Sequence, residues 1–127
     1  MLNDDLRTAE NGIPGEGPPV DIEKFRSRFN HNEEFQSKLV QIFIDDTPQA
    51  FAAMNQAMDS GDMKAAKKIA HTLANSCGVI QASRAVELSR KVEETIAKGE
   101  NPSSLAIPLG NEITRIITFL KGQFPLP

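Results

Sequence analysis

The spacing of the apolar residues is the feature that most constrains the fold of this chain. From Asp21 onward, apolar side chains recur every three or four positions, as they do on one face of an amphipathic helix. No stretch of useful length alternates with the two-residue period of a half-buried strand. The 127 residues suffice for one domain with a substantial core. The pattern predicts an all-α protein in which antiparallel helices joined by short loops form a bundle.

Capping residues and helix breakers divide this region into five expected helices. Their predicted first or capping residues are Asp21, Asn32, Asp62, Ser83 and Asn101-Pro102. Pro48 is expected to kink or break the second helix near residues 46–48, because proline removes a backbone donor. Gly61 suits the left-handed backbone at that helix's end. The phenylalanines and methionines, Phe35 among them, are expected to fill the core.

Residues 1–20 differ in composition from the rest of the chain. Residues 11–19 hold three glycines and three prolines, which favour extended or turning backbone. We therefore expect residues 1–20 to form a flexible linker or disordered lead-in, and residues 21–123 to form the helical domain. The alternative is an ordered arm packed on that domain.

The composition indicates in which cellular compartment the chain works and which classes of partner it lacks. The single cysteine, Cys77, excludes an internal disulfide and fits a reducing compartment. No apolar run approaches the roughly 20 residues that cross a bilayer, and the N-terminus carries no apolar signal segment. The net charge of −3 gives no general reason to expect nucleic acid. These features predict a cytoplasmic protein that contacts neither membrane nor nucleic acid.

The chain also lacks the residues that build common cofactor sites. Its two histidines, His31 and His71, lie far apart, so neither a His-Glu-x-x-His zinc site nor a Cys/His cluster can form. The eight glycines are scattered and form no phosphate-binding loop. We expect no metal and no nucleotide bound by the chain itself.

His71 lies on the wrong face of its helix for a core residue. At about 100° per residue, the apolar positions between Ala66 and Ile80 fall on an arc about 100° wide, and His71 lies roughly 150° from its centre. The imidazole is therefore expected to face solvent, where it keeps a nitrogen available as a nucleophile near neutral pH. A plain solvated surface histidine is the alternative. His31, between two asparagines in a turn, is a weaker candidate.

The residues around His71 favour contact with an anionic partner. The outer face is expected to carry Lys64, Lys67, Lys68, Ala74, Asn75 and Gly78. Three lysines raise the local positive potential, which attracts a phosphoryl group or an acidic surface. Ala74 and Gly78 leave the helix surface low, so that another protein's backbone can approach. Alternatively, the lysines serve solubility and Gly78 marks the helix end.

Residues 70–82 resemble the signature of histidine phosphotransfer (HPt) domains. That signature runs roughly Ala-His-x-Leu-Lys-Gly-Ser, then a small and an aliphatic residue, then Gly-Ala. The matching residues are Ala70, His71, Leu73, Ser76, Ile80 and Ala82. The turn at residues 57–62 and the helix around residues 87–94 are also similar, and the resemblance spans about residues 20–123.

The resemblance implies a fold and a role. HPt domains have a main body of four antiparallel helices, with the phosphorylatable histidine exposed midway along one of them. The helix after Asp21 would be an additional short N-terminal helix. The implied role is that of a phosphocarrier, not an enzyme, in which His71 exchanges a phosphoryl group with aspartates of response-regulator receiver domains. The expected partners are such a receiver, a hybrid sensor histidine kinase, or both, with Mg²⁺ and most of the catalytic machinery in the receiver.

Three positions depart from the family signature. Ala74 stands where a lysine is usual, and Asn75 and Gln81 stand where glycines are common. Lys67 or Lys68, one turn back, could replace the missing cation, and the Asn75 amide could donate to a phosphoryl oxygen. The departures leave open a module that binds receivers without transferring phosphate. A dimerising histidine-kinase helix pair fits less well, because the acidic residue and proline that follow the histidine of such kinases are absent.

Overall fold

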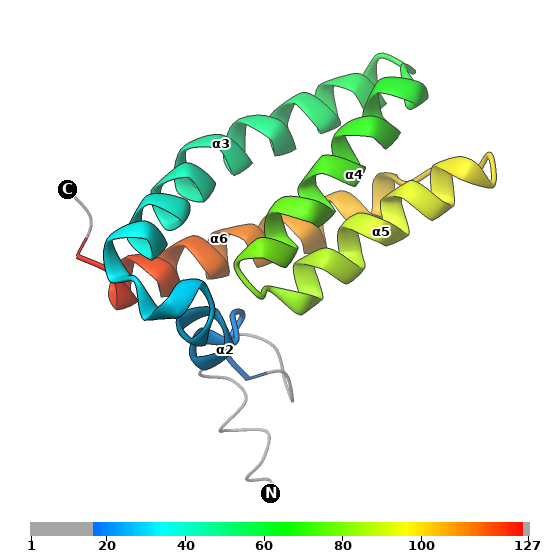
Figure 1. Cartoon of the computed structure of the whole chain (residues 1–127). Helices are drawn as coiled ribbons and strands as arrows, with labels where there is room; N and C mark the ends of the chain where they lie inside the picture. The colour runs from blue at the N-terminus through cyan, green and yellow to red at the C-terminus, as the bar shows by residue number, and fades with distance from the viewer. Residues whose placement is uncertain (1–16, 126–127) are drawn as a thin grey trace, which may run out of the picture.

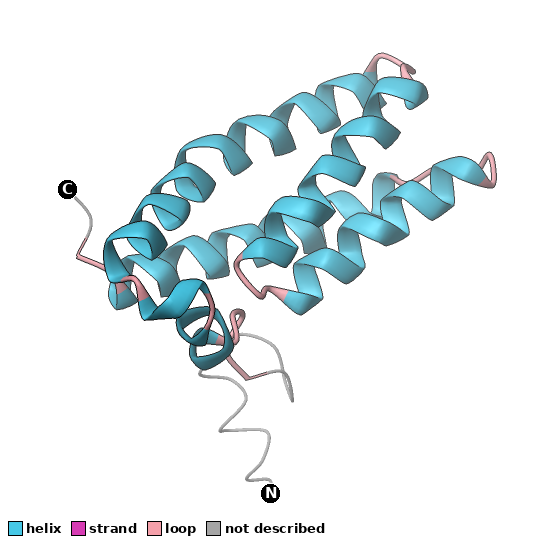
Figure 2. Ribbon diagram, viewed as in Figure 1, coloured by secondary structure: helices cyan, strands magenta, loops and turns pink. Residues whose placement is uncertain are grey.

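The computed structural model describes residues 17–125, so the expectation for residues 1–16 lies outside the described residues. Within residues 17–125 there are five α-helices, two short 3-10 turns and no strand (Figure 2). The helices are α2 (Ile22–Ser27), α3 (Glu33–Asp59), α4 (Met63–Val79), α5 (Ser83–Ala97) and α6 (Ala106–Gln123). The predicted all-α class is confirmed.

The four long helices form an antiparallel bundle (Figure 1). Helix α3 packs against α4 and α6, and α5 packs against the same two helices, so each long helix touches two neighbours. The short α2 lies at the end of the bundle where α3 begins and α6 ends. There Phe25 meets Phe124 edge to face, with ring centroids 5.9 Å apart. This is the predicted four-helix bundle with an additional N-terminal helix.

Helix starts follow the capping prediction at three of five sites. The side chains of Asp21, Asn32 and Asp62 each accept a hydrogen bond from the backbone N–H three residues on. The prediction for Ser83 was wrong by one residue, since Ala82 is the N-cap and Ser83 the first helical residue. The fifth start is also later than expected. Asn101 accepts from the Ser103 N–H, and a 3-10 turn (Ser103–Leu105) precedes α6.

Pro48 does not interrupt α3, so of the predicted kink or break, the break was wrong. The helix runs through it for 27 residues without a change of assignment. Buried side chains on both sides, Phe43 and Thr47 before Pro48 and Met54 after it, anchor the helix to the bundle. Packing of this apolar face outweighs the single backbone hydrogen bond that proline removes. Gly61 has φ 82° at the turn into α4, as predicted.

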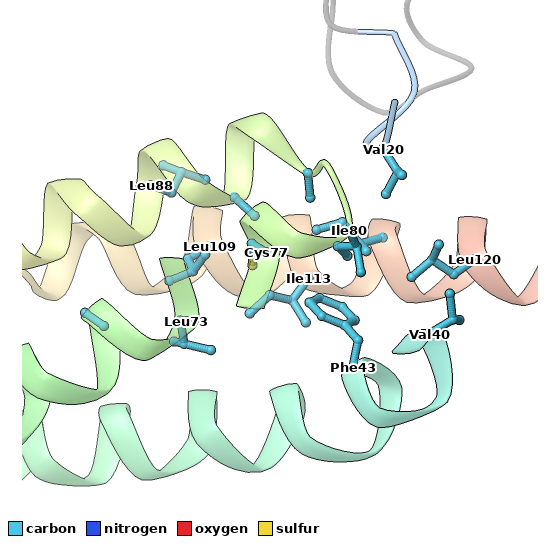
Figure 3. Close-up of a cluster of buried hydrophobic side chains, with 14 of the residues drawn as sticks. Val20, Val40, Phe43, Leu73, Cys77, Ile80, Leu88, Leu109, Ile113 and Leu120 are labelled. Carbon is cyan, nitrogen blue, oxygen red and sulfur yellow. The ribbon is translucent and has the colours of Figure 1, made fainter. Parts of the chain in front are cut away.

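The core lies along the axis of the bundle (Figure 3). Of the stripe predicted on α4, Ala66, Ala70, Leu73, Cys77 and Ile80 are buried. Val20 is also buried, with 1% exposure, and Arg115 donates to the Gly17 carbonyl oxygen. Residues 17–20 therefore pack on the domain, unlike the linker predicted to run to residue 20. Between residues 17 and 125, no helix has both the length and the apolar character to cross a membrane.

Candidate functional site

His71 lies midway along α4, with its neighbours Ala70 and Leu73 buried in the core. Its own side chain is 63% exposed. The outward placement predicted from helical periodicity is thus confirmed. The imidazole is accessible to a second protein without any rearrangement of the bundle.

The imidazole is held by a residue of the next helix. Nδ1 of His71 lies 3.0 Å from Oε2 of Glu93, on α5. An ionised carboxylate only accepts hydrogen bonds, so this contact requires a proton on Nδ1. In the neutral ring the lone pair is then on Nε2, the nitrogen that Glu93 does not contact. The pair therefore leaves the lone pair of Nε2 available to an approaching partner.

Sequence reasoning did not find Glu93. The residue follows Val92 of the apolar stripe, which places it at the edge of that stripe and near the boundary with a neighbouring helix. Its side chain is only 22% exposed, low for a glutamate, because α4 covers it. The edge position was a signal in the sequence. Which residue of α4 it meets depends on how the two helices pack, which periodicity does not give.

His71 and Glu93 line a shallow groove of about 350 Å³ between α4 and α5. The other lining residues are Lys67, Ala74, Asn75, Arg90, Glu94 and Ala97. Among the predicted supporting residues, the structure therefore brings Lys67, Ala74 and Asn75 together with His71. Lys64 and Lys68 are exposed on α4 but do not line the groove.

Ala74 is placed differently from the prediction, whereas Gly78 is partly exposed beside it. Ala74 is 3% exposed, so it lies at the α4–α5 boundary and not on the outer surface. The reason is rotation, since three residues turn the helix by about 300° and move Ala74 some 60° from His71 toward α5. Gly78 lines a neighbouring groove, and a Cβ there would meet only Val86 Cγ2, at 3.9 Å. Packing therefore does not require glycine at position 78, one residue before α4 ends.

A second, apolar groove continues from the first. It measures about 510 Å³ and shares Ala74, Asn75 and Arg90 with the histidine groove. The apolar side chains that line it are Phe29, Phe35, Leu39, Val79 and Val86. The expectation that Phe35 fills the core was wrong, because this residue is 44% exposed. Exposed apolar surface of this kind is typical of a protein–protein contact.

A left-handed turn sets the shape of the apolar groove. Residues 29–31 have φ values of 59°, 55° and 58°, and the buried amide of Gln36 donates to the carbonyl oxygens of Arg26 and Arg28 just before them. This arrangement turns the ring of Phe29 toward Phe35, with centroids 5.2 Å apart. His31 is exposed in the same turn and lines neither groove.

The other reactive side chains add no chemistry to the site. Burial raises the pKa of the Cys77 thiol to about 12, and the charge of Glu112 adds to that effect, so the thiol is a poor nucleophile. Among the residues that the structure describes, no three His, Cys, Asp or Glu side chains are grouped as metal ligands. The chemistry of the groove therefore depends on the imidazole.

The family model of the Hpt domain matches residues 38–122, which is more than half of the chain. The chain belongs to the Hpt domain family. Members of this family are phosphocarriers that interact with response-regulator receiver domains and kinases in phosphorelays. Membership confirms the resemblance found in the sequence and supports a role in histidine phosphotransfer.

A solved structure supports the same fold. Histidine-containing phosphotransfer protein B (HptB) from Pseudomonas aeruginosa PAO1 matches with a TM-score of 0.78 and 18% identity, over 85% of this chain and 96% of that chain. At this identity the match shows that the two Hpt domain chains share the helical bundle. No curated protein sequence matches the chain.

Proposed function

We propose that this Hpt domain carries a phosphoryl group on Nε2 of His71 and exchanges it with the aspartate of a response-regulator receiver domain. The exposed imidazole, held through Nδ1 by Glu93, is the observation that supports this role. Within residues 17–125, no other histidine lies beside a carboxylate within 4 Å.

The transfer follows from the geometry of the pair. The Nε2 lone pair attacks the phosphorus of the receiver's aspartyl phosphate, so that a P–N bond forms while the P–O bond to aspartate breaks. The aspartate leaves as a carboxylate. The ring becomes positively charged, and Glu93 stabilises that charge through the Nδ1 proton. Reversal of the same steps returns the phosphoryl group to a receiver.

Most of the remaining catalysis is expected from the partner. We propose that the chain holds no cofactor and that Mg²⁺ in the receiver neutralises the transferred group. Lys67 and Asn75, which line the groove, would offer an ammonium and an amide to the phosphoryl oxygens. Lys64 and Lys68 lie outside the groove and would contribute only through the longer-range field, which salt screens.

The apolar groove is the surface proposed for the partner. It adjoins His71, and its exposed Phe35 and Val79 would lose contact with water when a receiver covers them. The partner would be a separate response regulator, the receiver of a hybrid sensor histidine kinase, or both in turn. These partners and the reduced Cys77 favour a cytoplasmic location.

Transfer of labelled phosphate tests the assignment. A cognate receiver is phosphorylated, mixed with the domain, and the label on the domain is followed over time. The wild type and a His31→Gln control should gain acid-labile phosphate, whereas His71→Gln should gain none. Equal labelling of the wild type and His71→Gln would refute the role of His71.

The second candidate function is a receiver-binding adaptor without transfer. Ala74 favours it, because the family signature has a lysine at this position. Receiver binding that survives His71→Ala, with no phosphate ever found on the wild type, would support the adaptor over the carrier.

A further inference from the structure

The groove around His71 contains a carboxylate whose negative charge repels a phosphoryl group. Four charged side chains line it besides the imidazole: Lys67, Arg90, Glu93 and Glu94. Two positive and two negative charges sum to zero. A phosphoryl group on His71 carries about two negative charges and would lie close to the carboxylate of Glu93. Nearby cations are needed to offset the resulting repulsion. Without Arg90 the same groove would carry a net charge of −1 before the phosphoryl group arrives.

The position of the family's lysine does not supply that cation in this chain. Ala74 occupies it, and its side chain is 3% exposed at the boundary between α4 and α5. Ala74 lines both the histidine groove and the apolar groove, so it lies where the two meet. At this position α4 therefore contributes no cation to the junction between the phosphoryl acceptor and the surface proposed for the partner.

Arg90 of α5 lines the same two grooves as Ala74. It is exposed, and within residues 17–125 no hydrogen bond or ion pair occupies its guanidinium. It lies three residues before Glu93, which places both side chains on one face of α5. Lys67 lines only the histidine groove, so it does not reach the junction.

We propose that Arg90 binds the phosphoryl group carried by His71, and so supplies from α5 the cation that Ala74 has removed from α4. A guanidinium is charged at all working pH values and can donate two parallel hydrogen bonds to phosphoryl oxygens. Placed at the junction, it would contact the group both while it rests on His71 and while the receiver's aspartate approaches. The proposal rests on the phosphotransfer role proposed above.

Phosphotransfer and ³¹P NMR on the full chain test this role together. Arg90→Ala should take phosphate from a phosphorylated receiver about tenfold more slowly. The titration midpoint of phosphorylated His71, followed by ³¹P NMR, should rise, because a neighbouring cation favours the dianionic phosphoryl group. Arg90→Lys should bring both the transfer rate and the titration midpoint most of the way back to their wild-type values. Lys91→Ala, which removes the adjacent exposed cation outside both grooves, should change neither.

A relocated cation provides the decisive variant. Ala74→Lys in the Arg90→Ala background restores the lysine of the family signature and should recover the transfer rate, with circular dichroism confirming that the bundle still folds. If Arg90→Ala has the same transfer rate and the same ³¹P titration midpoint as the wild type, the role of Arg90 is overturned and that of His71 stays intact. A wild type that takes no phosphate would instead overturn the proposed function, and this inference with it.

Discussion

The imidazole of His71 on α4 and the carboxylate of Glu93 on α5 form a polar pair across a helix–helix boundary, with Nδ1 and Oε2 3.0 Å apart. The packing of α4 on α5 thereby decides which ring nitrogen bears the proton. Neither side chain is fully buried, so the pair orients the ring without removing it from the surface.

Glu93 is predicted to fix the tautomer of His71. Glu93→Ala should allow both tautomers, as measured by the ¹⁵N shifts of the ring, and should slow phosphotransfer about tenfold through loss of a charge-assisted hydrogen bond. Glu93→Gln keeps an acceptor oxygen, so its phosphotransfer rate should fall less than that of Glu93→Ala. Glu94→Ala, in the same groove but without contact to the ring, is the control and should leave the tautomer unchanged. A wild-type ring protonated on Nε2 would contradict the prediction.

Phe35 is predicted to contribute to partner binding more than to stability. Its side chain is 44% exposed in the apolar groove, so Phe35→Ala should weaken receiver binding about tenfold. The loss of its edge contact with Phe29 should cost about 1 kcal/mol of unfolding free energy. Ile107→Ala, which trims a 75% exposed side chain outside the groove, should leave affinity unchanged. Titration calorimetry with the receiver measures the two affinities, and urea unfolding measures the change in stability. Equal affinities for the two variants would exclude this docking surface.

Gln81→Gly is predicted to stabilise the domain. Gln81 has φ 64°, a left-handed conformation that costs a residue with a Cβ roughly 1–2 kcal/mol. Glycine removes that cost but loses more backbone entropy on folding, which leaves a net gain of about 0.5–1 kcal/mol. The same change at Gln49, in the interior of α3, should destabilise by about 1 kcal/mol. Urea unfolding compares the two, and changes of the same sign would show that backbone conformation does not control the effect.

Cys77 is predicted to make stability fall at alkaline pH. Burial raises its pKa from about 9 to about 12, so between these values the unfolded chain has released a proton that the folded chain retains. The contribution of the neutral thiol is complete below about pH 9 and falls by about 1.4 kcal/mol per pH unit above it. Urea unfolding of the wild type and Cys77→Ala between about pH 8 and pH 10.5 measures the difference. Identical pH slopes would contradict the assigned burial of the thiol.

The sequence by itself determined the local features of this protein. Caps at Asp21, Asn32 and Asp62 and the apolar stripe of α4 depend on residues within a few positions of one another, and so does the outward face of His71. Helix geometry converts such spacings directly into directions. The family signature around His71 depends on the same short stretch, which is why it was found without the fold.

Only the tertiary structure decided what His71 meets. Glu93 and Arg90 reach its groove because α5 packs on α4 in one register, and helical periodicity does not encode the register between two helices. Packing likewise carried α3 through Pro48 and left Phe35 on the surface. In each case contacts between residues distant in sequence outweighed a local preference of about a few kcal/mol. The outward placement of His71 was therefore determined by the sequence, and its surroundings by the packing of the bundle.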